Sequence, residues 1–527
     1  MRGEAGASAV RRAGGGPRAA LPWLRALAGR NKLFTWALAG GAVLRLFAVL
    51  GYPGALWFYG DSYVYIGAAL RPEPNLSKST GYSLFLRLLL PFHSMTLVAV
   101  LQHLMGLAVA VMIYALLRRN NVARRWSAIA TLPVLFDGYL VEDEHLIMAE
   151  ALFTFLLITG LLLILWRGQT PWWAALAAGL FTGYAVDVRT QGAVVLVLFP
   201  LAMLVRGRAW RTVRGWVAVA LLAVGCLIPV GAYASWFHSR TGQYNMTLST
   251  GFYLWGRVSS FADCATIKPT GREALVCPKE PLADRTPPGN FIWHAPEVHT
   301  DLNSSRGPVT PVNNTLLTNF AIHAVEAQPL GYVKTVAKGV LMSFGFPRIR
   351  YPAEGTTVYY AFHLHYARYH LLPPKDREWI GPHVAANSAY ADWLRYGGEA
   401  PGAVRKVFAI PLIGYQKVFY TWGPLLAVIF LTGLGGVFAI RRKGRELSQV
   451  RLRAEVRGTS MLPWLTAVGL LVFPIAVADF DYRYLLPVIP FACAAAGLAF
   501  APARKAVGEP RDTPEAVRQP GRAYPTG

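Results

Sequence analysis

Charged side chains are scarce in this chain, and acidic ones are the scarcest. Only 15% of the 527 residues are Asp, Glu, Lys or Arg, whereas 54% are hydrophobic, and the mean hydropathy is +0.34. Soluble globular domains carry about 25% charged residues, so the composition excludes that class. It predicts a protein that is embedded in lipid.

Motifs for nucleotide binding are absent as well. The sequence has no Walker loop and no G-x-G-x-x-G that follows a strand, so an ATP-driven activity is excluded. Energy must come from the substrate or from a gradient. No separate basic domain with nucleic-acid-binding aromatics is present either. The 52 Lys and Arg residues, against 28 Asp and Glu, stand in short clusters between apolar runs, which is typical of the cytoplasmic side of membrane proteins.

Only four cysteines occur. Cys226 and Cys493 lie inside apolar runs, while Cys264 and Cys277 lie close together in a long polar region. The second pair is a candidate disulfide, provided that this region faces an oxidising compartment.

The apolar runs predict an all-α polytopic membrane protein of about ten transmembrane helices, because about 20 apolar residues cross the hydrocarbon core. The expected spans are residues 33–50, 95–117, 126–140, 151–166, 172–186, 193–205, 216–236, 418–440, 461–478 and 485–500. Each basic cluster then falls on one side of the membrane, which the positive-inside rule assigns to the cytoplasm.

This topology divides the chain into five parts. We expect a basic cytoplasmic tail (1–32), an N-terminal transmembrane module (33–237), a mixed extracytoplasmic loop domain (238–407), a C-terminal transmembrane module (408–501) and a cytoplasmic tail without fixed structure (502–527). Within the loop domain, residues 321–346 form an amphipathic stretch that should lie on the membrane surface. Both termini are expected in the cytoplasm, with the protein in the plasma membrane.

The acidic residues collect at the outer face. Asp61 follows the first span among aromatic residues, where a partly desolvated carboxylate can accept a proton from a hydroxyl; the alternative is a solvated loop aspartate that caps a helix. The run from Glu142 to His145, with Glu150, indicates a site for a cation, a metal or a hydroxyl-rich ligand. A solvated loop explains that run almost as well.

Several arginines lie at depths where a guanidinium must be paired. Arg45 lies within an apolar segment, and Arg189 and Arg483 lie at span ends. A lipid phosphate can bind such a group through two donors. A salt bridge to a neighbouring carboxylate, such as Asp187 or Asp481, is an equally good explanation for any one of them.

The order of these features resembles the GT-C superfamily of polyprenyl-phosphate-sugar-dependent glycosyltransferases, which includes protein O-mannosyltransferases and aminoarabinose transferases. The resemblance rests on Asp61, on the segments 81–86, 101–106, 117–119 and 144–153, on Asp187-Val188-Arg189 and on the segment 482–487. The abundance of Ala, Arg and Gly looks actinobacterial.

The resemblance implies an inverting sugar transfer at the outer face from a polyprenyl-phosphate donor to a glycan, lipid or protein acceptor. Asp61 would act as base, and the second acidic residue would be Asp143 or Glu144. Arg189, Arg483 and Arg45 would hold the donor phosphate, and we expect substrate contacts from Glu150, His145, Tyr82 and Tyr482. No residues are assigned to a metal; no cofactor is certain, and a divalent cation is left open. A lipid or solute transporter, a flippase and a non-catalytic cell-envelope assembly protein are the alternatives.

Overall fold

The computed structural model describes residues 31–58, 61–297, 302, 309–349, 351–352, 360–364, 386–397, 404–438 and 447–501. The predicted C-terminal tail and all but the last two residues of the N-terminal tail lie outside these ranges. The same holds for residues 439–446, which comprise the end of the eighth predicted span and the start of the basic loop that follows it.

Each of the predicted spans contains a helix, and the all-α fold is confirmed. Four helices in the described ranges are long and apolar enough to cross a membrane, or five if the bent pair α20–α21 forms one span. These are α2 (Lys32–Gly51), α5 (Met95–Arg119), α12 (Val213–Thr241) and residues 459–477 of α22 (Leu447–Val477). In the bent pair, α20 (Lys406–Val418) and α21 (Gly423–Phe438) meet at 61°. The total of ten spans stays a prediction.

The remaining bundle helices are shorter than a full span. They are α9 (Glu150–Leu165), α10 (Trp172–Val188), α11 (Ala193–Val205) and α23 (Val488–Leu498). Their faces pack into one large hydrophobic cluster with α2, α5 and α22. Burial inside the bundle replaces lipid contact, so these helices are consistent with membrane segments despite their length.

The third predicted span is not one helix. It is divided into α6 (Arg124–Ile129), α7 (Leu132–Phe136) and α8 (Gly138–Asp143). Pro133 lies at the start of α7, and Asp137 caps α8 by accepting hydrogen bonds from the amides of Tyr139 and Leu140. The breaks expose backbone carbonyls, and the Arg45 guanidinium donates to the carbonyl oxygens of Leu135 at 2.9 Å and Val134 at 3.3 Å.

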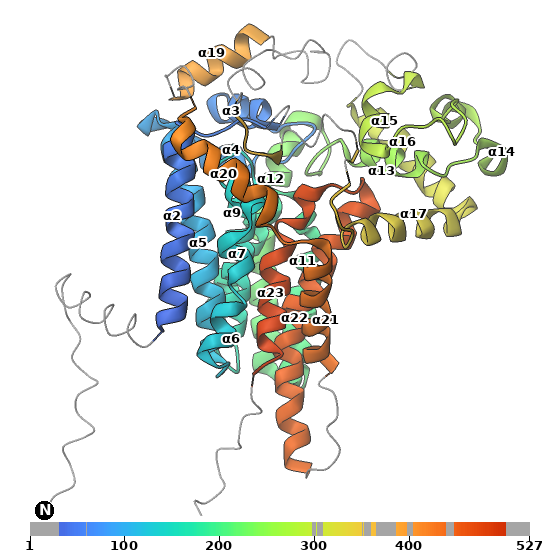
Figure 1. The fold of residues 1–527 in the computed structure, drawn as a ribbon. Helices are drawn as coiled ribbons and strands as arrows, with labels where there is room; N and C mark the ends of the chain where they lie inside the picture. The colour runs from blue at the N-terminus through green and yellow to red at the C-terminus, as the bar shows by residue number, and fades with distance from the viewer. Residues whose placement is uncertain are drawn as a thin grey trace, which may run out of the picture.

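The short helices after α2 and the helices of the loop domain gather at one end of the bundle (Figure 1). There α3 (Asp61–Leu70), α4 (Gly81–Leu89) and the 3₁₀ turn η1 (Leu90–Phe92) connect the first two long helices. The described part of the loop domain consists of α13 (Thr250–Ser259), α14 (Cys264–Ile267), η4 (Gly271–Val276), α15 (Pro288–His294), α16 (Pro311–Ala327), α17 (Pro329–Met342) and α19 (Ala386–Gly397). No strand occurs among the described residues, whereas a mixed loop domain was expected; proline-rich connections between short helices explain its irregular composition.

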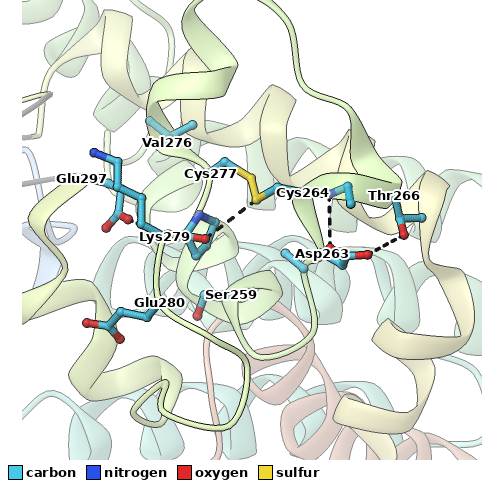
Figure 2. The surroundings of a disulfide bond; sticks show 12 residues. Ser259, Asp263, Cys264, Thr266, Val276, Cys277, Lys279, Glu280 and Glu297 are labelled. Atoms are coloured by element: carbon cyan, nitrogen blue, oxygen red, sulfur yellow. Dashed lines mark hydrogen bonds between the residues drawn. A yellow bond between two sulfur atoms is a disulfide. The ribbon is translucent and has the colours of Figure 1, made fainter.

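Two features stabilise the loop domain. It has its own hydrophobic cluster, in which Trp255, Phe291 and Phe320 are buried. In addition, Cys264 at the start of α14 is bonded to Cys277 after η4 (Figure 2). The amphipathic stretch 321–346 belongs to two helices, because Pro329 starts α17 directly after Gln328 ends α16.

Candidate functional site

Asp61 stands at the first turn of α3 and lies between two cations. Its carboxylate pairs with the Lys78 ammonium through one oxygen and with the Arg483 guanidinium through the other, the second pair at 2.6 Å. The Asp61 side chain retains 16% of its exposure, so it is close to solvent but largely enclosed. Burial opposes ionisation, but the charges of Lys78 and Arg483 outweigh it and hold the pKa of Asp61 well below its usual range.

Arg483 reaches Asp61 from the opposite end of the chain. It lies in the turn η8 (Tyr482–Leu485), where Asp481 caps the turn by accepting from the Arg483 amide at 3.0 Å. The guanidinium lies over the rings of Phe58 at 5.4 Å and Tyr484 at 5.3 Å. Its Nε is 3.4 Å from an Asp481 oxygen but is buried without a hydrogen-bond partner. The group is therefore fixed in place with donor capacity left over.

A third cation, Arg189, lies beside Lys78 and Arg483. Arg189 ends α10 and forms an ion pair with Glu150, the first residue of α9. Its guanidinium is 5.9 Å from the ring of Tyr484, the same ring that Arg483 contacts. The three cations Lys78, Arg189 and Arg483 thus surround one area at the end of the bundle that carries α3 and α4, and Glu150 is a partner of Arg189 there.

Glu144 lies in a different environment from Asp61. Its two oxygens accept from Nε and Nη2 of Arg45, both at 2.7 Å, and one of them also contacts Nδ1 of His103 at 2.9 Å. All three side chains are buried. Arg45 is thereby engaged with Glu144 and the carbonyls of α7, away from the Asp61 cluster.

His145 continues this buried network. Its Nε2 is 2.9 Å from the Tyr52 carbonyl, an acceptor, so Nε2 donates and Nδ1 accepts from Nε2 of His103 at 2.9 Å. Burial and the adjacent His103 lower the pKa of His145 to about 3. Tyr82 lies below the same loop: its hydroxyl donates to Gln102 at 2.6 Å, and the Gln102 amide donates to the carbonyls of Glu144 and Leu146.

Asp143, unlike Glu144, lies within the influence of Arg189 and Arg483. It is buried, and burial raises its pKa to about 8, although the charge of Arg189 acts in the opposite direction. Of the two acidic residues that the sequence could not separate, Glu144 is thus paired within the buried network, whereas Asp143 experiences the charges of Arg189 and Arg483.

Sequence reasoning missed four residues of this cluster. Lys78 is not among the predicted site residues, although a lysine that follows shortly after Asp61 is a signal that could have been used. Tyr65, Tyr253 and Tyr484 are the others; the charges of Asp61, Arg189 and Arg483 act on Tyr65, and Tyr253 comes from α13 of the loop domain. Tyr65, Tyr253 and Tyr484 thus lie beside the charges of Asp61, Arg189 and Arg483.

Tyr482 points away from the Asp61 cluster. Its hydroxyl accepts a hydrogen bond from the Ile349 amide at 2.8 Å, and its ring lies 4.5 Å from the Arg348 guanidinium. As for metals, no group of three or more His, Cys, Asp or Glu side chains is arranged to hold an ion within the described ranges.

Comparison with known proteins now bears on this geometry. Residues 73–245 match the model of the dolichyl-phosphate-mannose-protein mannosyltransferase family. Over these residues, about a third of its length, the chain is similar to that glycosyltransferase family. The segment includes Lys78, Asp143, Glu150 and Arg189, and the resemblance to polyprenyl-phosphate-dependent glycosyltransferases is confirmed there. No curated protein sequence matches the chain significantly.

Solved structures give only a distant likeness. The oligosaccharyltransferase of Archaeoglobus fulgidus, tethered with an acceptor peptide, aligns at 11% identity and a TM-score of 0.37, over 88% of this chain and 49% of the archaeal one. ArnT from Cupriavidus metallidurans aligns at 14% identity and a TM-score of 0.30, over 92% of this chain and 78% of its own. The chain thus spans about half the length of the archaeal enzyme, and TM-scores this low carry no conclusion on mechanism.

Proposed function

We propose that this protein is an integral membrane glycosyltransferase that moves a sugar from a polyprenyl-phosphate donor to an acceptor hydroxyl at the outer face of the plasma membrane. The observation that carries the proposal is the Asp61 carboxylate held between Lys78 and Arg483, with Arg189 beside them. One carboxylate next to three cations suits a reaction in which a phosphate leaves and a hydroxyl loses its proton.

The proposed reaction is a single inverting displacement. The acceptor oxygen attacks the anomeric carbon, the bond from that carbon to the phosphate oxygen breaks, and the hydroxyl proton passes to Asp61. The polyprenyl phosphate departs with the electron pair, and Lys78, Arg189 and Arg483 stabilise its charge. Because phosphate is a good leaving group, no general acid is needed.

The ion pairs suggest how the donor activates the base. In the structure both Lys78 and Arg483 pair with Asp61, and the lowered pKa of Asp61 makes it a weak base. A donor phosphate that binds Lys78 and Arg483 competes with Asp61 for them, so the pKa of Asp61 rises towards its usual value. Proton acceptance is then coupled to the presence of the donor.

Asp143 is our proposal for the second acidic residue, because Glu144 is already paired with Arg45 and His103. A carboxylic acid with a pKa near 8 can donate a hydrogen bond at neutral pH, and Asp143 is placed to do so beside Arg189. We assign a positioning role to four residues that hold the end of α8, where Asp143 lies: Arg45, Glu144, His145 and Tyr82. Glu150 is assigned to orienting Arg189.

The test is transfer from radiolabelled polyprenyl-phosphate sugars to endogenous acceptors in membranes with and without the protein. We expect Asp61→Asn to lose transfer by about a hundredfold or more, while the matched surface variant Asp284→Asn keeps wild-type activity. Full activity of Asp61→Asn would refute its role as base. No label transfer by the wild type with any donor, together with label crossing the membrane, would favour a transporter.

A further inference from the structure

A shallow groove opens on the outer side of the molecule between α17 and the turn η8, apart from the Asp61 cluster. Its volume is about 540 Å³, and its walls include Lys334, Lys338, Leu341, Met342, Ile349 and Tyr482. The Tyr482 hydroxyl closes its inner end by accepting from the Ile349 amide. The groove is therefore apolar along its length with two ammonium groups along one wall.

The position of α17 sets the depth of this groove in the membrane. The inner side of α17 packs on the outer end of α22: the Tyr332 hydroxyl donates to the Ala476 carbonyl at 3.0 Å, and a Cβ on Gly339 would lie 2.6 Å from Ile475. Since α22 is one of the four helices that can span the membrane, α17 lies across the end of a span. That is the level of the lipid headgroups.

The outer side of α17 is apolar and uncovered. Leu330 is 73% exposed and Leu341 is 69% exposed, and Phe346 beyond the helix end is 60% exposed. Side chains of this kind are stable at that depth only when acyl chains cover them.

Lys334 and Lys338 lie one turn apart on the same exposed side. Within the described ranges neither lysine forms an ion pair. Basic residues are enriched on the cytoplasmic side of membrane proteins, and a pair on the outer side runs against that tendency. An anion at the headgroup level accounts for their placement, because each lysine near a membrane surface attracts anionic lipid.

We infer that this groove binds an anionic phospholipid of the outer leaflet, with the headgroup phosphate on Lys334 and Lys338 and an acyl chain along Leu341 and Ile349. Two properties of the groove favour this occupant: the positive charges of Lys334 and Lys338 match the negative phosphate, and α17 lies at the level of the lipid headgroups. The site is separate from the proposed donor site, because Arg483 and Tyr482 of the same turn point in different directions: Arg483 pairs with Asp61, and Tyr482 forms the groove wall. The inference does not rest on the proposed catalytic function.

Native mass spectrometry of the full-length protein in detergent tests this inference, with phosphatidylglycerol, phosphatidylcholine and a polyprenyl phosphate as probes. We expect the wild type to retain phosphatidylglycerol in preference to phosphatidylcholine. The variant Lys334→Gln/Lys338→Gln should weaken phosphatidylglycerol binding roughly tenfold to thirtyfold, as expected for the loss of two interfacial lysines. Lys268→Gln/Arg272→Gln, with the same charge change on exposed residues of the loop domain, should bind as the wild type does.

A second variant separates groove binding from general electrostatic attraction. Ala337 also lines the groove, so Ala337→Trp fills it while both lysines remain, and we expect a similar loss of phosphatidylglycerol. The inference is overturned if Ala337→Trp has no effect, if the control variant loses as much lipid, or if phosphatidylcholine binds equally well. Displacement of phosphatidylglycerol from the groove by equimolar polyprenyl phosphate would overturn the choice of occupant.

Discussion

Two carboxylates of this protein, Glu144 and Asp61, are both paired with arginine, yet the consequences differ. Glu144 is buried with Arg45 and His103, and both of its oxygens accept hydrogen bonds from Arg45, whose helix α2 is fixed in the bundle. Asp61 keeps partial exposure, and its partners Lys78 and Arg483 come from a loop and a short turn. The Glu144 pair is suited to stabilising the fold, whereas an anionic ligand can replace Asp61 as the partner of Lys78 and Arg483.

Removing one partner of the buried pair should destabilise the protein strongly. We expect Glu144→Gln to lose about 3 to 5 kcal/mol, because Arg45 then stays charged and unpaired in a buried position. Thermal unfolding of the detergent-solubilised protein measures this, with the exposed Glu326→Gln as the matched control. A melting temperature unchanged from the wild type would show that Arg45 finds its charge compensation elsewhere.

The raised pKa of Asp143 predicts a pH dependence of donor binding. Below about pH 8 the side chain is protonated and neutral, and above it a carboxylate forms beside the anionic donor phosphate. We therefore expect the affinity of the wild type for a polyprenyl phosphate to fall several-fold as pH rises through about 8. Asp143→Asn, which stays neutral, should show a flat profile over the same range; a rise in wild-type affinity would contradict the assignment.

At the residue level the sequence predicted several members of the cluster around Asp61 but not how all of them pair. Asp61, Arg189, Arg483 and Glu150 were all expected at the outer face, and the structure brings them into one cluster. The sequence could not choose between Asp143 and Glu144. Side chains of adjacent residues point in different directions, and only the fold of α8 determines which of the two faces Arg189 and Arg483. It also could not show that Arg45 pairs with Glu144, since the two lie 99 residues apart.

Among the elements, the contact between α4 and α10 depends on a glycine. A Cβ on Gly81 would overlap the backbone of Asp187 and the amide of Val188, and the Tyr184 hydroxyl donates to the Gly81 carbonyl at 2.9 Å. The start of α4 is thus fixed against the end of α10. The next residue after α10 is Arg189, whose side chain lies beside Arg483.

We expect Gly81→Ala to separate these helices at a cost of about 1 to 3 kcal/mol and to reduce sugar transfer by displacing Arg189. Gly231→Ala is the control, because it lies within α12 with open space around its Cβ position and should be neutral or slightly stabilising. Melting temperature and transfer rate are measured together. If Gly81→Ala matched Gly231→Ala in melting temperature and in transfer rate, the close contact between α4 and α10 would not be needed for stability or activity.

The helices themselves were predictable where hydropathy alone determines them. The bounds of α2, α5, α9, α10 and α11 differ from the expected spans by a few residues at most. The prediction failed to describe the third span, where Pro133 and the Asp137 cap divide an apolar run that hydropathy treats as continuous. The fold of the loop domain was equally out of reach, because polar sequence without periodicity gives no register to its helices.

For the whole molecule, the sidedness of the bundle is the property on which function depends. Its free cysteines, Cys226 and Cys493, are buried, so single exposed cysteines can report on each face. We expect a membrane-impermeant maleimide to label Tyr244→Cys in intact cells and to label Arg124→Cys only after the cells are broken, since the two lie at opposite ends of the bundle. The reverse pattern would place the Asp61 cluster in the cytoplasm.

The division of the segment from α6 to α8 has a consequence for biosynthesis. A run interrupted by Pro133 and Asp137 leaves carbonyls that lipid cannot satisfy, and Arg45 of α2 supplies the donors. The charged Arg45 guanidinium also raises the free energy of α2 in the hydrocarbon region until it pairs with Glu144. Each segment is therefore less stable in the bilayer alone than with the other, and we expect α2 to become stable in lipid only when the segment some 90 residues later has been inserted beside it.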